Sequence, residues 1–218
     1  MKLVLVCGSW GSGTSVVAGL LVRIGCHAPG PFFQSNDPRT LNTYESIPFI
    51  EIVQRLVSNT TLALSAPSGN AVIEALGRFK QGFLREACRR RGVSEDGPIM
   101  LKYPLSAVII GEIASVFDTR LIVVVRPLGQ IEDTRKRRQW PAIFGEEGAK
   151  VIYPHIFNHV ITHDTPAMVV NHSELLKHPR DCLEDIERFV FRDCNHGRLD
   201  DALSFIRTSS SQVGAESH

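Results

Sequence analysis

The chain has 218 residues, which is enough for one α/β domain with a sizeable buried core. Its 24 basic and 23 acidic side chains give a formal charge of +1, and this near-neutral total argues against a general nucleic-acid-binding protein while leaving a local anion site open. No stretch approaches the ~20 apolar residues that a membrane-spanning helix needs, so no membrane span is expected.

The first expected element is a buried strand over residues 3–7, which leads into a glycine-rich loop. The loop has the sequence Gly8-Ser-Trp-Gly-Ser-Gly-Thr-Ser15, and a helix is expected from residue 14 to residue 24. Backbone N–H groups and a helix N-terminus then converge on one point, which suits a phosphate or sulfate better than a purely structural turn does. The spacing fits the nucleotide-binding loop of nucleoside triphosphatases, but Thr14 stands where those proteins carry Lys.

Three further segments lie before the second strand. Residues 36–43 contain Asp37-Pro38 and form the most loop-like internal segment, which is a candidate substrate-facing loop. A helix is expected to start near Ser46, whose hydroxyl can cap it. A longer helix is expected over residues 70–91, where apolar side chains recur at helical spacing and three arginines precede Gly92.

The remaining elements alternate between strands and helices. Strands are expected over residues 98–101, 120–125 and 167–170, and helices over residues 105–117, 129–139, 146–163 and from residue 179 onward. Because these strands are short, rich in Val, Ile and Leu and not alternating, both of their faces should be covered. We therefore expect an α/β fold, a three-layer α/β/α arrangement with a central parallel sheet of about four to five strands and a phosphate-binding type of loop. A single domain is expected over residues 1–207, followed by a disordered polar tail over residues 208–218.

The strand over residues 120–125 ends in Arg126. A protein that uses Mg-ATP needs a lysine in its phosphate loop and usually an aspartate at such a strand end to hold the metal. An arginine there suits a phosphate and repels Mg²⁺. The loop and the strand-end arginine together favour a ligand that brings its phosphates without a metal.

At this point the residues resemble those of the sulfotransferase family. The loop Gly8-x-x-x-Ser12-Gly-Thr-Ser15 is similar to the phosphosulfate-binding loop of that family, which commonly has the sequence G-x-x-R-S-G-T-S. Residues 121–134 resemble its second signature, a strand-end Arg followed about two helical turns later by a Ser, here Arg126 and Thr134. Three weaker likenesses follow the family's order: Thr43-Tyr-Glu45-Ser, Met100-Leu-Lys102-Tyr-Pro104, and the stretch of residues 168–179.

The resemblance implies transfer of a sulfuryl group from 3′-phosphoadenosine 5′-phosphosulfate (PAPS) to a hydroxyl or amine, with no metal required. The acceptor would be a small molecule or a glycan, and its identity is open. The resemblance assigns the 5′-phosphosulfate to five loop residues, namely Gly11, Ser12, Gly13, Thr14 and Ser15. It assigns the 3′-phosphate of the donor to Arg126 and Thr134.

Two candidate catalytic residues follow from the same resemblance. Glu45 is the candidate general base, and the alternative is a solvated carboxylate in the first turn of the next helix. Gly11 departs from the family, which usually has Arg or Lys there to steady the bridging oxygen as the sulfuryl group leaves. Loss of such a group costs on the order of 10²–10³ in rate. Lys102 is the first candidate to replace it.

Two other functions stay open, the first of them because of Gly11. One is a catalytically impaired nucleotide-binding protein of the same fold, and the other is a phosphate-loop kinase or nucleoside triphosphatase, against which Thr14 and Arg126 argue. The histidines at 155, 159 and 163 recur on one helix face, where they form a polar surface or supply a substitute base. One residue of the basic run 135–138 is expected to contact the ligand.

The cysteines bear on the compartment. They stand at positions 7, 26, 88, 182 and 194, without a C-x-x-C pair, so neither a disulfide framework nor a zinc site is indicated. A reducing compartment suits such a set best. No signal peptide is visible, and a cytoplasmic location is expected.

Overall fold

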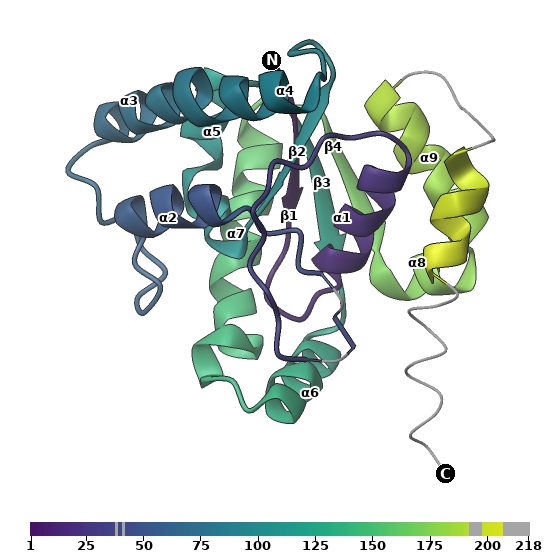
Figure 1. The fold of residues 1–218 in the computed structure, drawn as a ribbon. Helices are drawn as coiled ribbons and strands as arrows, with labels where there is room; N and C mark the ends of the chain where they lie inside the picture. The colour runs from purple at the N-terminus through teal and green to yellow at the C-terminus, as the bar shows by residue number, and fades with distance from the viewer. Residues whose placement is uncertain (38, 41, 192–197, 207–218) are drawn as a thin grey trace.

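A sheet of four parallel strands forms the centre of the molecule (Figure 1). The computed structural model describes residues 1–37, 39–40, 42–191 and 198–206. The strands are β1 (Lys2–Cys7), β2 (Pro98–Lys102), β3 (Asp118–Val125) and β4 (Ala167–Asn171), in the spatial order β2-β1-β3-β4. All four apolar runs identified in the sequence are therefore strands, and the predicted parallel pairing is confirmed.

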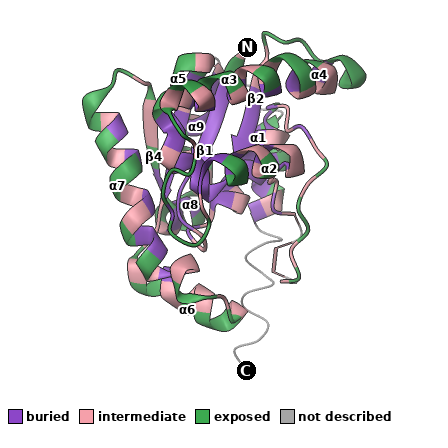
Figure 2. Cartoon of the chain, turned by 90° about the vertical axis from the view of Figure 1, so that its left-hand side faces the viewer, coloured by how far each residue is buried: buried purple, intermediate pink, exposed green. Residues whose placement is uncertain are grey.

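Helices cover both faces of the sheet, as the continuous apolar character of its strands predicts. Leu3 and Leu5 of β1 point toward α2 (Ile47–Leu56), α3 (Gly69–Phe79), α5 (Ile110–Val116) and α7 (Glu146–Thr162). Val4 and Val6 point the other way, toward α1 (Thr14–Arg23), α8 (His172–Lys177), α9 (Pro179–Phe191) and a helical segment at 198–206. Figure 2 shows the buried strands between these layers. The predicted three-layer α/β/α architecture is confirmed.

Two of the expected helices differ in detail from the prediction. The run over residues 70–91 is interrupted by a π-helical turn, η1 (Lys80–Leu84), before it continues as α4 (Arg85–Arg91). At this turn the ammonium of Lys80 donates a hydrogen bond of 2.5 Å to the carbonyl of Val116, a tertiary contact that helical periodicity cannot reveal. The run over residues 105–117 begins as a 3₁₀ helix, η2 (Pro104–Ile109), before it becomes α5.

The helix caps match the sequence in part. Asn171 caps α8, because its side chain accepts hydrogen bonds from the N–H groups of Ser173 and Glu174. Ser46 occupies the N-cap position of α2, but its hydroxyl makes no capping hydrogen bond.

The carboxyl ends of all four strands lie at the same edge of the sheet. All strands are parallel, so β1, β2, β3 and β4 end at the same edge, and α6 (Leu128–Arg138) and η3 (Ala142–Phe144) follow the end of β3. The chain passes from β1 to β2 on one side and then to β3 on the other side of β1. In open parallel sheets, ligands bind outside the carboxyl ends of the strands at this kind of reversal.

Two expectations fall on parts of the chain that are not described. The predicted polar tail and Cys194 lie outside the described residues. Within the part of the chain that the structure describes, no helix combines the length and the apolar character needed to cross a membrane.

Candidate functional site

The loop between β1 and α1 requires glycine at two positions. Gly11 and Gly13 have φ of +75° and +96°, a region that residues with a side chain rarely adopt. A Cβ on Gly13 would also overlap the imidazole ring of His172. The hydroxyl and N–H of Ser12 both donate to the carbonyl of Ser9, at 2.7 and 3.2 Å, so Ser12 faces into the loop and fixes its turn.

The loop ends at an uncapped helix N-terminus. Gly13 is the N-cap residue of α1, and no side chain caps the helix there. The N–H groups of Thr14 and Ser15 belong to the first turn, so they have no acceptor within the helix and carry the positive end of its dipole. These groups can therefore hold an anion.

Arg126 joins this loop to α6. Its Nη1 donates to the carbonyl oxygen of Gly11 at 3.0 Å and to Oγ1 of Thr134 at 3.3 Å, and its Nε donates to Oε1 of Gln130 at 3.0 Å. All three of these partners are uncharged, so the guanidinium has no hydrogen-bonded ion-pair partner among them, although the carboxylate of Asp133 acts on its charge from nearby. Burial, followed by the charge of Arg137, lowers the pKa of Arg126, and a bound anion would relieve this cost.

Two residues that the sequence analysis did not single out, His172 and Tyr153, lie close to the loop and help to hold it. His172 follows the carboxyl end of β4 and packs against Gly13. Burial and the charge of Arg126 lower the pKa of His172 to about 4, so this imidazole is neutral at pH 7. Tyr153 of α7 donates from its hydroxyl to the carbonyl of Val124 at 3.1 Å, and burial raises its pKa. The sequence did contain a signal that could have identified His172 as a site residue, because it directly follows a parallel strand.

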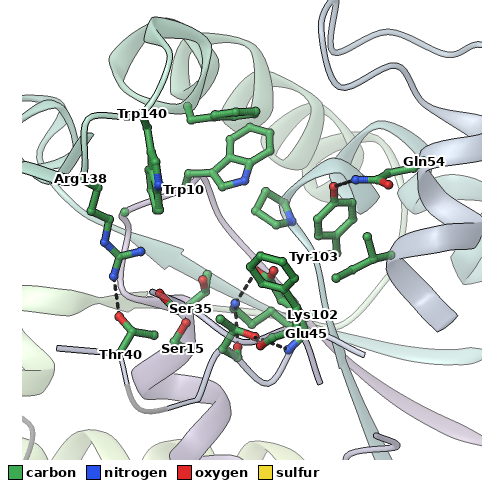
Figure 3. Close-up of a pocket in the computed structure, with 17 residues that line it drawn as sticks. Trp10, Ser15, Ser35, Thr40, Glu45, Gln54, Lys102, Tyr103, Arg138 and Trp140 are labelled. Atoms are coloured by element: carbon green, nitrogen blue, oxygen red, sulfur yellow. Dashed lines mark hydrogen bonds and ion pairs between the residues drawn. The ribbon is translucent and has the colours of Figure 1, made fainter. Parts of the chain in front are cut away.

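A cavity of about 260 Å³ opens beside the loop (Figure 3). The loop contributes Trp10, Gly11, Thr14 and Ser15 to its lining. The other lining residues come from the segment 33–54, from the end of β2 and from the turn after α6: Phe33, Ser35, Thr40, Thr43, Glu45, Ile50, Gln54, Lys102, Tyr103, Pro104, Arg138, Trp140 and Phe144. The segment of residues 36–43, predicted to face a substrate, therefore borders the cavity beside the glycine-rich loop of residues 8–15, which is called the anion loop below.

The structure brings the two candidate catalytic residues together. Nζ of Lys102, at the carboxyl end of β2, donates to Oε1 of Glu45 at 2.7 Å and to the carbonyl oxygen of Thr43 at 2.9 Å. The side chain of Lys102 is 3% exposed and that of Glu45 is 14% exposed. Glu45 precedes the N-cap of α2, so the alternative of a solvated carboxylate in the first helical turn is wrong.

The residue between the two acceptors of Lys102 has an unusual backbone. Tyr44 adopts a left-handed φ of 56°, a conformation that costs a non-glycine residue roughly 1–3 kcal/mol. Its N–H donates to Oδ1 of Asn42 at 2.8 Å, and its hydroxyl accepts from Nη1 of Arg23 at 3.2 Å. This conformation allows both the Thr43 carbonyl and the Glu45 carboxylate to face Lys102.

The other candidates from the sequence divide between the site and the scaffold. Arg138 lines the cavity, whereas Arg135 pairs with Glu132 at 2.8 Å. Of the three helix-face histidines, none lines the cavity, and His159 instead contacts the hydroxyl of Thr165 at 2.9 Å. Trp10 packs against Phe144 with ring centroids 4.7 Å apart, so it forms a wall of the cavity.

Among the described residues, no group of three or more His, Cys, Asp or Glu is placed to hold a metal ion. The four cysteines in the described part of the chain, at positions 7, 26, 88 and 182, are free thiols.

We predict that Gly13→Ala destabilises the fold. The added methyl group would meet His172 at a backbone φ that alanine disfavours, and the expected loss in the free energy of unfolding is roughly 2–4 kcal/mol. Gly77→Ala is the matched control: it lies inside α3 with nothing within 4 Å, and it should gain up to about 1 kcal/mol. Urea unfolding of both variants measures the difference, and equal stabilities would contradict the role given to Gly13.

We predict that the neutral state of His172 makes stability depend on pH. Its pKa is near 6.5 in the unfolded chain and about 4 in the folded protein, so the unfolded chain binds the proton first as the pH falls. The stabilisation is complete above pH 6.5 and is lost between there and pH 4. From pH 7 to pH 5 the free energy of unfolding should fall by about 1–2 kcal/mol through this residue. His172→Gln should flatten this part of the profile, whereas His155→Gln, at an exposed position of α7, should not.

We compared the chain with known proteins to find which of them share its architecture. No protein-family model matches the chain, and no curated protein matches its sequence. Among solved structures, the sulfotransferase STF1 from Mycobacterium tuberculosis matches with a TM-score of 0.60 and 14% identity, over 95% of this chain and 71% of that chain. The sulfotransferase domain of the Synechococcus PCC 7002 olefin synthase matches with a TM-score of 0.55 and 15% identity, over 91% and 76% of the two chains. At these identities the likeness concerns the fold, and the chain has the fold of the sulfotransferases.

Proposed function

We propose that the protein is a sulfotransferase that moves a sulfuryl group from PAPS to a hydroxyl or amine of a small-molecule or glycan acceptor. One observation carries the proposal: the anion loop and the buried Glu45–Lys102 pair line the same cavity. A donor held at the loop and an acceptor in the cavity would meet beside a carboxylate that can remove a proton. The likeness to sulfotransferase structures supports the fold on which this rests.

In this proposal the loop holds the 5′-phosphosulfate of the donor. The first-turn N–H groups of α1, with the backbone of Gly11 and Gly13 and the hydroxyls of Thr14 and Ser15, supply the donors that an anion needs. Arg126 and Thr134 would hold the 3′-phosphate. Arg126 suits a phosphate because its guanidinium is half-buried and its hydrogen-bond partners are all uncharged.

Glu45 acts as the general base. Its carboxylate takes the proton of the acceptor as the acceptor oxygen or nitrogen forms a bond to sulfur. The donor supplies the sulfuryl group, and its bond from sulfur to the bridging oxygen breaks, which leaves the electron pair on the 5′-phosphate. Lys102 positions the carboxylate, because its own hydrogen bonds to Glu45 and Thr43 fix both groups.

One observation keeps the second candidate, a nucleotide-binding protein that has lost transfer. Residues 8–15 contain no charged side chain, so the loop itself supplies no cation to the reacting group. Binding of the nucleotide without transfer to any acceptor would favour this candidate over the enzyme.

Nucleotide binding tests the donor site. We expect adenosine 3′,5′-bisphosphate to bind in calorimetry without a metal, and Arg126→Gln to weaken binding by roughly 10- to 100-fold, the worth of a charged hydrogen bond. Arg78→Gln, at an exposed arginine of α3, is the control and should bind as the wild type does. Absence of binding at millimolar nucleotide, or Mg-dependent ATP turnover, would overturn the proposal.

Transfer of labelled sulfate from PAPS to an acceptor panel tests the base. Glu45→Gln keeps the shape of the side chain but cannot take a proton, and we expect kcat to fall by roughly 10²–10⁴. Bisphosphate affinity should stay within about threefold, because Glu45 does not belong to the donor loop. Unchanged turnover in this variant would show that the Glu45–Lys102 pair only supports the fold.

A further inference from the structure

Sulfuryl transfer needs a positive charge that the loop does not supply. As the sulfur leaves, negative charge grows on the bridging oxygen, and a positioned cation there stabilises the transition state. The loop of residues 8–15 is uncharged, so such a cation must come from another element. The inference below rests on the proposed function and names the residue that supplies this charge.

Helix α6 fills the space beside Gly11. A Cβ at this position would lie 3.2 Å from Cβ and Cγ2 of Thr134 and 3.4 Å from the carbonyl oxygen of Ile131. Helix α6 therefore packs directly against the loop, and a long side chain at position 11 has no room on this side. Residues four apart share a helix face, so Arg138 lies one turn beyond Thr134 on the face that meets the loop.

Arg138 lies in the wall of the cavity. It lines the cavity together with Gly11, Thr14 and Glu45, and its side chain is 17% exposed. The guanidinium lies 4.5 Å from the centre of the Trp140 ring and donates to the hydroxyl of Thr40. Figure 3 shows Arg138 and Trp140 on one side of the cavity, across from Glu45 and Lys102. The side chain is thus held in place by Asp37, Thr40 and Trp140 at the wall of a cavity that the loop and Glu45 also line.

Two cationic side chains line the cavity, Lys102 and Arg138, and they differ in how far their charge is neutralised. Lys102 is paired with Glu45 at 2.7 Å, so their charges cancel. Asp37 is shared between Arg137 at 2.9 Å and Arg138 at 2.5 Å, so one carboxylate faces two guanidinium groups and a net positive charge remains. Burial lowers the pKa of Arg138, and the nearby Asp37 and Glu45 oppose that shift, so its charge acts in a partly desolvated setting where electrostatic effects are strong.

We propose that Arg138 is a catalytic residue whose guanidinium stabilises the transferring sulfuryl group and the bridging oxygen, in place of a cation in the loop. Asp37, Thr40 and Trp140 are its positioning residues. This assigns the charge to α6 rather than to Lys102, whose part is to hold the base.

Turnover of labelled PAPS by Arg138→Gln tests the assignment. We expect kcat to fall by roughly 10²–10³, with bisphosphate affinity within about threefold of the wild type. Arg138→Lys, which keeps a charge, should retain more activity than Arg138→Gln. Arg78→Gln, at an exposed arginine of α3 that does not line this cavity, is the control, and its kcat should stay within about threefold.

A structural role for Arg138 makes a different prediction. If the arginine only ties the segment around Asp37 to α6, then Asp37→Asn should lose as much activity as Arg138→Gln. If the charge acts on the reacting group, Asp37→Asn should lose clearly less. Equal losses in these two variants, or unchanged kcat in Arg138→Gln, would overturn the proposal.

A second measurement needs no acceptor. In a Glu45→Gln background, Arg138→Gln should weaken binding of PAPS by roughly tenfold while binding of the bisphosphate, which lacks the sulfuryl group, stays the same. An equal effect on both ligands, or none, counts against Arg138. Failure of the unaltered protein to bind either ligand would instead overturn the proposed function, so the two failures are distinguishable.

Discussion

The ammonium group of Lys102 is almost completely removed from water at the carboxyl end of β2. A buried charge is costly unless it is paired and hydrogen-bonded. The chain meets this requirement by bringing residues 43–45 across the end of the strand, where a carbonyl and a carboxylate both accept from Nζ. The path of this segment in turn forms one side of the cavity and brings Glu45 into the same cavity as the loop of residues 8–15. The strained backbone of Tyr44 is a further cost of the same arrangement.

Helix α6 links the two halves of the candidate site. Gln130, Thr134 and Arg138 recur every four residues along one of its faces, so a single rigid element contacts Arg126, the loop at Gly11 and the cavity. Loop residues alone would leave these groups free to move independently. Mounting them on one helix fixes the separation between Arg126 and the cavity, which is the kind of pre-organisation that the proposed transfer would require.

The sequence alone was sufficient for the architecture and insufficient for the tertiary pairing at the site. Buried parallel strands appear as unbroken apolar runs, and the glycine positions of the loop follow from backbone sterics, so both were predictable. The π-helical turn at Lys80 was not, because no local pattern marks it and the hydrogen bond that Lys80 makes there, to Val116, crosses the fold. The pairing of Glu45 with Lys102 spans 57 residues, and that of Asp37 with Arg137 spans 100, so neither leaves a local pattern. The contact of His172 with Gly13 was also missed: the position of His172 after a parallel strand is a local signal, but its packing against Gly13 is not.

The packing of Thr134 against Gly11 also limits how this site can change over evolutionary time. An arginine introduced at position 11 would have to adopt a left-handed backbone and would meet the side chain of Thr134. A cation at position 11 would therefore need accompanying changes in the backbone of the loop and at Thr134, and a single substitution would not supply it without strain.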